Sequence, residues 1–98
     1  MIEERARLDT SGDRWAVSGS LVMDSASALL DASRAHALPS AGLVDLARVE
    51  RVDSAAVAVM LAWKRRAVAE GKSLAFTGLP QSMASLAALY GVQELLGQ

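Results

Sequence analysis

Residues 44–61 read VDLARVERVDSAAVAVML, and the rest of the chain can be organised around this stretch. It begins with an apolar run, passes through a short charged segment, and reaches an Asp-Ser pair directly before a long series of good helix formers. Asp and Ser are favoured at helix N-caps because their side-chain oxygens accept hydrogen bonds from free backbone N–H groups. We therefore predict a strand over 42–46, a loop over 47–52, and a helix over 54–70 that is closed by Gly71.

Before this stretch, the pattern predicts a hairpin and a helix. Apolar and polar residues alternate weakly over 6–9 and more clearly over 15–17, and the turn-forming residues 10–13 lie between these two segments. The chain is expected to leave the second strand at 18–21. Asp24 or Ser25 is a suitable N-cap for a helix that runs to about Ala37, before Pro39. One face of this helix is expected to carry Ala26, Leu29, Leu30 and Ser33.

After this stretch, a strand over 73–77 and a last helix are expected. Pro80 suits the first position of that helix, and Gly91 ends it. The buried face of the helix is predicted to hold Met83, Leu86, Ala87 and Tyr90, and a short apolar clamp is predicted from Val92, Leu95 and Leu96. The resulting ββαβαβα order predicts one α/β domain over 1–98. We expect a mixed sheet of four strands with three helices mostly on one face, because right-handed crossovers are the rule between parallel strands.

Composition excludes several classes of function. The 98 residues carry a formal net charge of −1 with dispersed charges, which argues against nucleic-acid binding. The chain has no cysteine, and its one histidine, His36, has no companion at ligand spacing, so we expect no metal and no cofactor, with His36 at the surface or near a helix C-terminus. Neither an export signal nor a run long enough to span a bilayer is visible, so any membrane association is expected through a partner.

The helix over 54–70 has more apolar surface than one sheet-facing side requires. At 100° per residue one arc, assigned to the sheet, holds Val57, Leu61 and Val68, and a second arc holds Val59, Met60, Trp63 and Ala67. Two interpretations of Trp63 stay open. It packs against the neighbouring helix, or it is an exposed aromatic anchor for a partner, since Trp is enriched at interface hot spots. In the second case, polar contacts would come from a rim of Lys64, Arg65, Arg66 and Glu70.

The order of elements and several short segments resemble the STAS domain family, the fold of anti-sigma factor antagonists and of the cytoplasmic tails of sulfate transporters. The segments are VSGSL at 17–21, VDL at 44–46, VDSA at 52–55 and LYGVQELL at 89–96. Within the family, LAWKRRA at 61–67 and the final segment look most like the small stand-alone MlaB subunits of Mla-type phospholipid transporters. One departure is Ala56, where the family commonly has Gly two places after the hydroxyl residue.

This resemblance implies a non-enzymatic subunit that binds the ATPase of an Mla-type phospholipid ABC transporter and stabilises or regulates it. The subunit would be cytoplasmic, peripheral to the inner membrane through its partner, and part of an oligomer through the transporter complex. We predict that the partner contacts Asp53, Ser54, Ala55, Val59, Met60, Trp63 and Arg66. The alternative is an anti-sigma factor antagonist that is switched by phosphorylation of Ser54, although Ala56 and the neighbouring carboxylates disfavour a phosphate there.

Three polar residues in the central stretch need individual interpretations. Asp53 or Ser54 caps the helix, and this role is compatible with partner contact by Ser54. Asp45 lies within an apolar strand, and it is either solvated or bonded to loop N–H groups at a strand end, or it supports the surface around Ser54. No nucleophile–base set, metal cluster or phosphate loop accompanies the two carboxylates, so catalysis is not predicted.

Overall fold

Four strands form one mixed sheet, in which their spatial order is the same as their order in the sequence. The structure is a computed structural model that describes residues 5–92. Strand β1 is antiparallel to β2, whereas β2, β3 and β4 are parallel. The elements are β1 (Arg7–Asp9), β2 (Trp15–Leu21), α1 (Met23–Ser33), β3 (Leu43–Val52), α2 (Ser54–Ala69), β4 (Ala75–Thr77) and α3 (Gln81–Leu89). The predicted ββαβαβα order and mixed four-stranded sheet are confirmed.

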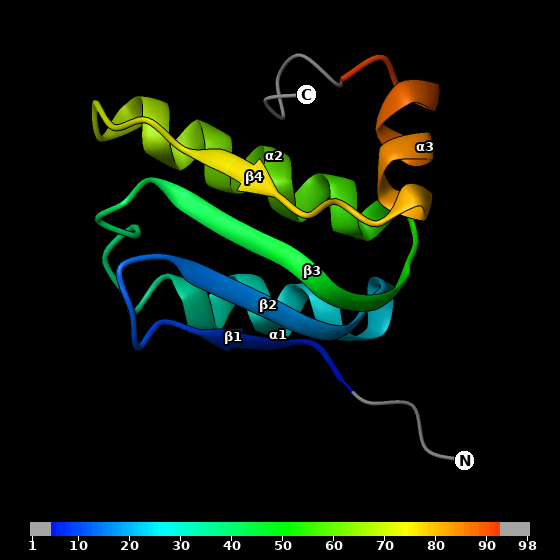
Figure 1. The fold of residues 1–98 in the computed structure, drawn as a ribbon, viewed down its shortest axis with the longest axis horizontal. Coiled ribbons are helices and arrows are strands. Elements are labelled where there is room, and N and C mark those ends of the chain that lie inside the picture. Colours follow the sequence, from blue (N-terminus) through cyan, green and yellow to red (C-terminus); the bar gives the residue numbers. More distant parts are fainter. Residues whose placement is uncertain (1–4, 93–98) are drawn as a thin grey trace.

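Helices α1 and α2 lie side by side on the same face of the sheet, and α3 lies across the end of α2 (Figure 1). The chain moves from β2 to β3 to β4 in one direction across the sheet, so successive crossovers of the same hand place α1 and α2 on the same face. The other face, turned toward the viewer in Figure 1, is not covered by any helix among residues 5–92. The expectation that the helices gather mostly on one face is therefore confirmed.

Strand β3 is longer than the sequence pattern indicated. The residues 47–52, predicted as a loop, continue the strand to Val52. In its pairing with β2, strand β3 twice advances by three residues while β2 advances by two. This happens once between Asp45 and Arg48 and once between Val49 and Val52. These irregularities are β-bulges, which place an extra residue in one strand. Because of them, the inward-facing residues Leu46, Val49 and Val52 recur every third position, and the two-residue alternation that marks a strand is lost.

Asp45 has a structural role at the first irregularity. Its carboxylate oxygen Oδ1 accepts a hydrogen bond from the backbone N–H of Ala47 at 2.9 Å. A bulge leaves backbone groups without their regular ladder partners, so a side-chain acceptor two residues earlier compensates for one of them. The predicted bonding of Asp45 to nearby N–H groups is thus confirmed, although the residue lies within β3 and not at its end.

Several element boundaries differ from the predictions. Strand β2 does not end at 17 but runs to Leu21. Helix α1 begins at Met23 with Val22 at the N-cap, so Asp24 and Ser25 lie in the first turn, and the helix ends at Ser33 instead of near Ala37. Strand β4 is limited to three residues, 75–77. Ser25 is not the N-cap but lies in the first turn, where its buried hydroxyl donates to the carbonyl of Ser20 at 2.6 Å and accepts from the N–H of Val22 at 3.4 Å.

The last helix, α3, keeps some of its predicted core contacts and loses others. Pro80 is its N-cap and not its first helical residue. Met83 and Ala87 are fully buried, whereas Tyr90 is 52% exposed, so its assignment to the buried face was wrong. The helix ends before Gly91, where the N–H of Val92 donates to the carbonyl of Ala87. Val92 packs against the core, while Leu95 and Leu96 of the predicted clamp lie outside the described residues.

The bulge in β3 makes Gly78 a sensitive position. A Cβ at Gly78 would lie 2.9 Å from the Cβ of Ala47, and the residue has φ +66°. Gly71 has nearly the same φ, +68°, but a Cβ there would meet nothing within 4 Å. We predict that Gly78→Ala lowers the free energy of unfolding by about 1–3 kcal/mol more than Gly71→Ala, since overpacking adds to the backbone strain that both share. Urea unfolding of both variants measures this, and equal losses would contradict it.

Candidate functional site

The amino end of α2 has the geometry that the sequence predicted. Asp53 is the N-cap, and its Oδ1 accepts a hydrogen bond from the backbone N–H of Ala55 at 2.8 Å. Ser54 is the first residue of the helix and is exposed, and Ala55 is partly buried. The capping prediction is confirmed with Asp53 as the capping residue. This leaves the hydroxyl of Ser54 at the surface, where a partner or a modifying enzyme can reach it.

The carboxylate of Asp53 has a second contact that the sequence did not reveal. Its Oδ2 accepts a hydrogen bond from the backbone N–H of Met23, the first residue of α1, at 3.0 Å. The amino ends of α1 and α2 therefore meet at one side chain. The side chain of Met23 is 71% exposed. Met23 adds an apolar group to the candidate site.

Asp45 does not belong to the surface around Ser54. It is the third residue of the ten-residue strand β3, whereas Ser54 follows the other end of that strand. At about 3.3 Å per residue, the strand separates the two positions by more than roughly 20 Å. The expectation that Asp45 supports this surface was therefore wrong, and Asp53 is the carboxylate beside Ser54.

Three residues predicted at the partner surface are in the core. Val59 is 2% exposed, Met60 is fully buried, and Trp63 is 1% exposed. The assignment of the two apolar arcs of α2 was wrong in most positions: the arc with Trp63 is buried, whereas in the other arc only Val57 is buried and Val68 is 78% exposed. The interpretation of Trp63 as an exposed anchor is thus wrong, and the alternative that Trp63 packs against the neighbouring helix is confirmed.

The environment of Trp63 explains why its indole is inside. Its ring packs edge-on against Trp15 of β2, with centroids 5.4 Å apart and planes at 73°. Its Nε1–H donates to the hydroxyl of Ser33 on α1 at 2.9 Å, and that hydroxyl donates to the carbonyl of Leu30 at 2.6 Å. A buried indole N–H needs an acceptor, and Ser33 supplies it.

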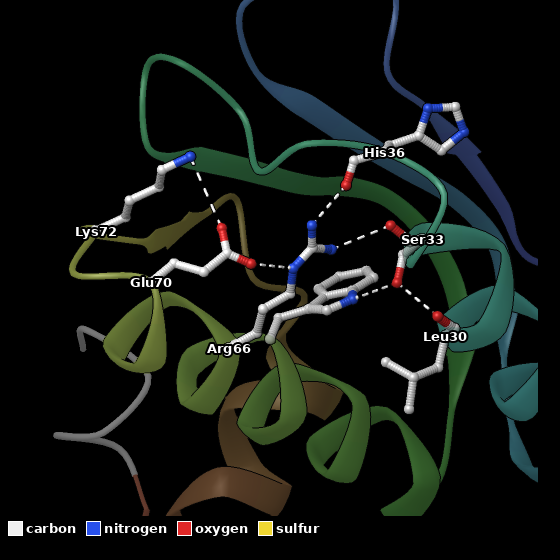
Figure 2. A network of polar contacts seen from close by, with 7 residues as sticks. Leu30, Ser33, His36, Arg66, Glu70 and Lys72 are labelled. Carbon is white, nitrogen blue, oxygen red and sulfur yellow. Dashed lines mark hydrogen bonds and ion pairs between the residues drawn. The ribbon is translucent and has the colours of Figure 1, made fainter.

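Arg66 fastens the carboxyl ends of α1 and α2 together, as Figure 2 shows. Its guanidinium donates to the carbonyls of Ser33 at 3.1 Å and His36 at 2.6 Å, and to the carboxylate of Glu70 at 2.8 Å. The carbonyls that end a helix carry partial negative charge, which a guanidinium satisfies well. Arg66 was predicted to contact a partner, but three of its N–H groups donate to acceptors within the chain. His36 is exposed, as predicted.

The outward face of α2 consists of residues that the sequence interpretation did not select. Opposite the buried arc, most positions are small or apolar and only one is charged. These exposed or partly exposed positions are Ser54, Ala58, Leu61, Ala62, Arg65, Val68 and Ala69. A solvent-facing helix surface normally carries several charges, so this composition is typical of a contact surface. The 3.6-residue repeat of Ala58, Ala62, Arg65 and Ala69 could have indicated it once Trp63 was placed inside.

Comparison with known families agrees with this arrangement. A family model described as Mlab, STAS domain, matches residues 5–97. The chain belongs to the STAS domain family. No curated protein matches the chain. The match covers nearly the whole chain, and the four-stranded mixed sheet with three helices agrees with a STAS-like fold.

Within residues 5–92, the structure holds no group of three or more His, Cys, Asp or Glu side chains that could bind a metal ion. In the same range, no helix has the length and apolarity to cross a bilayer. The candidate functional features within residues 5–92 are the outward face of α2 and the junction of two helix ends at Asp53.

The Arg66–Glu70 pair generates a pH-dependent prediction. The hydrogen bond from Arg66 holds the pKa of Glu70 below its ordinary value of 4.5. Because the pKa is lower in the folded state, ionised Glu70 stabilises the fold, and this stabilisation is fully present at pH values above 4.5. It is lost as the pH falls through the lowered pKa. We predict that Glu70→Gln is less stable than the native chain at neutral pH and that the difference vanishes in acid.

Urea unfolding of both proteins across this pH range measures the effect. Glu50→Gln, the same change at an exposed carboxylate on β3, serves as the control. A stability difference between Glu70→Gln and the native chain that does not shrink in acid would show that the ion pair is not its source.

Proposed function

We propose that this STAS domain is a non-enzymatic subunit that binds the ATPase of an Mla-type phospholipid ABC transporter and stabilises or regulates it. The observation that carries the proposal is the outward face of α2, which is almost uncharged from Ser54 to Ala69 apart from Arg65. In this proposal the chain is cytoplasmic and is held at the inner membrane only through the ATPase. The description of the matching family, an Mlab-type STAS domain, supports this choice of partner.

The physical argument concerns what the face can bind. Burial of Ala58, Leu61 and Ala62 by a partner removes apolar area from water, and the two alanines have no rotamers to lose on burial. Small side chains also let a second backbone approach α2 closely. Arg65 lies within this face and is suited to a carboxylate on the partner. A folded protein with a small apolar recess and an acidic group therefore fits this surface.

Co-purification with the ATPase of an Mla-type phospholipid ABC transporter from the same organism tests the proposal. We predict that Ala58→Arg abolishes co-purification or weakens binding at least about tenfold, since a long charged side chain would be forced into the contact. Ala32→Arg places the same side chain on an exposed position of α1 and should bind normally. Absence of a complex with the native chain, or an intact complex with Ala58→Arg, would overturn the proposal.

A second candidate function rests on the exposure of Ser54. An anti-sigma factor antagonist that is switched by a serine kinase needs an accessible hydroxyl at this point, and Ser54 provides one. The phosphate would, however, lie next to the Asp53 carboxylate, which already binds the free N–H groups there. Like-charge repulsion therefore disfavours this function.

Intact-mass measurement of protein isolated from its own cells separates the two functions. Under the transporter proposal, we predict an unmodified mass. A stoichiometric phosphate that disappears in Ser54→Ala would favour the phosphorylation switch instead.

A further inference from the structure

Asp53 does more than begin α2. Each of its carboxylate oxygens accepts one backbone N–H, and the two donors belong to different helices: Ala55 of α2 at 2.8 Å and Met23 of α1 at 3.0 Å. The N-cap of α1 is Val22, whose side chain cannot accept a hydrogen bond. The hydroxyl of Ser25 accepts from the N–H of Val22 at 3.4 Å, but the N–H of Met23 is bound by a side chain that lies thirty positions further along the chain.

This link determines which groups stand next to the proposed docking face. It fixes the start of α1, with the exposed side chain of Met23, beside the start of α2, with the exposed Ser54. Methionine is flexible and apolar, and it adapts well to a partner's recess. A surface built from two helices binds tightly only if their relative position is fixed before binding, because ordering it on binding would cost affinity.

We infer that Asp53 is a positioning residue that joins the amino ends of α1 and α2 into one docking surface, on which Met23 and Ser54 contact the ATPase together. This inference rests on the proposed function and extends the contact from α2 onto α1. Asp53 acts through Met23: the carboxylate holds the backbone of Met23, and the Met23 side chain meets the partner.

Asp53→Asn separates this role from simple capping. Asparagine is nearly isosteric and is as good an N-cap as aspartate, but its amide has one oxygen acceptor, and its nitrogen would face the N–H of Met23 as a second donor. We expect the cap on Ala55 to persist and the link to Met23 to be lost. Amide hydrogen exchange followed by NMR should then show faster exchange at Met23 and unchanged protection at Ala55.

Binding to the ATPase is the second measurement. We predict that Asp53→Asn and Met23→Gln each raise the dissociation constant at least about fivefold by titration calorimetry with the full-length chain. Met23→Gln keeps the length and helix propensity of the side chain but removes its apolar character. Asp31→Asn is the matched control, because it removes an exposed carboxylate paired with Arg34 on α1 and should leave the affinity unchanged.

The outcomes distinguish this inference from the proposed function. If the native chain does not bind the ATPase, the proposed function fails, and this inference fails with it. If the native chain binds and Ala58→Arg does not, but Asp53→Asn and Met23→Gln bind normally, only the inference is overturned. It is also overturned if Asp53→Asn loses protection at Ala55 instead of Met23, since weaker binding would then report the loss of the α2 cap.

Discussion

The packing of the Trp63 indole against Trp15 and Ser33 is the interaction on which the helical layer depends. It joins three elements at one point: α2 carries the indole, β2 carries the ring that it packs against, and α1 carries the hydroxyl that accepts its N–H. A residue of this size with a polar edge can be buried only where a hydrogen-bond acceptor is available. Its position therefore fixes the rotation of α2 about its own axis.

That rotation determines the composition of the surface. With Trp63 and Met60 turned toward the sheet, the opposite side of α2 is left with alanines, Leu61 and Arg65. The unusual feature of α2 is thus that apolar residues surround it almost completely, so burial of one side leaves a second apolar side in solvent. The excess apolar character that the sequence predicted is real, but it resides in small residues and not in a large aromatic anchor.

The sequence was sufficient for the fold and only partly sufficient for the site. The order of elements was predictable because turn-forming residues and helix caps such as Asp53 separate them locally. The second half of β3 was missed because two bulges replace the two-residue alternation of a strand by a three-residue spacing at Leu46, Val49 and Val52. Apolar residues lie on both the buried and the outward side of α2, so their periodicity does not indicate which side is buried, and the location of Trp63 could not be settled. The Asp53–Met23 contact joins residues thirty positions apart, and no local pattern reports it.

Three side chains of the α2 segment bind α1, one at the amino end of α1 and two at its carboxyl end. Asp53 binds the first N–H of α1, Trp63 binds Ser33, and Arg66 binds the carbonyls at the carboxyl end of α1. At the amino end of α1, the negative carboxylate of Asp53 meets the partial positive charge of a backbone N–H. At the carboxyl end, the positive guanidinium of Arg66 meets the partial negative charge of the carbonyls. Both pairings agree with the direction of the helix dipole. These bonds all lie on the side of α2 that faces α1, so none of them uses the outward face. The two helices can therefore be held rigidly in parallel while the outward face of α2 stays free for a partner. Ser54 lies at the amino-terminal edge of that face, because Asp53, the residue that joins the two helices, is also the N-cap of α2.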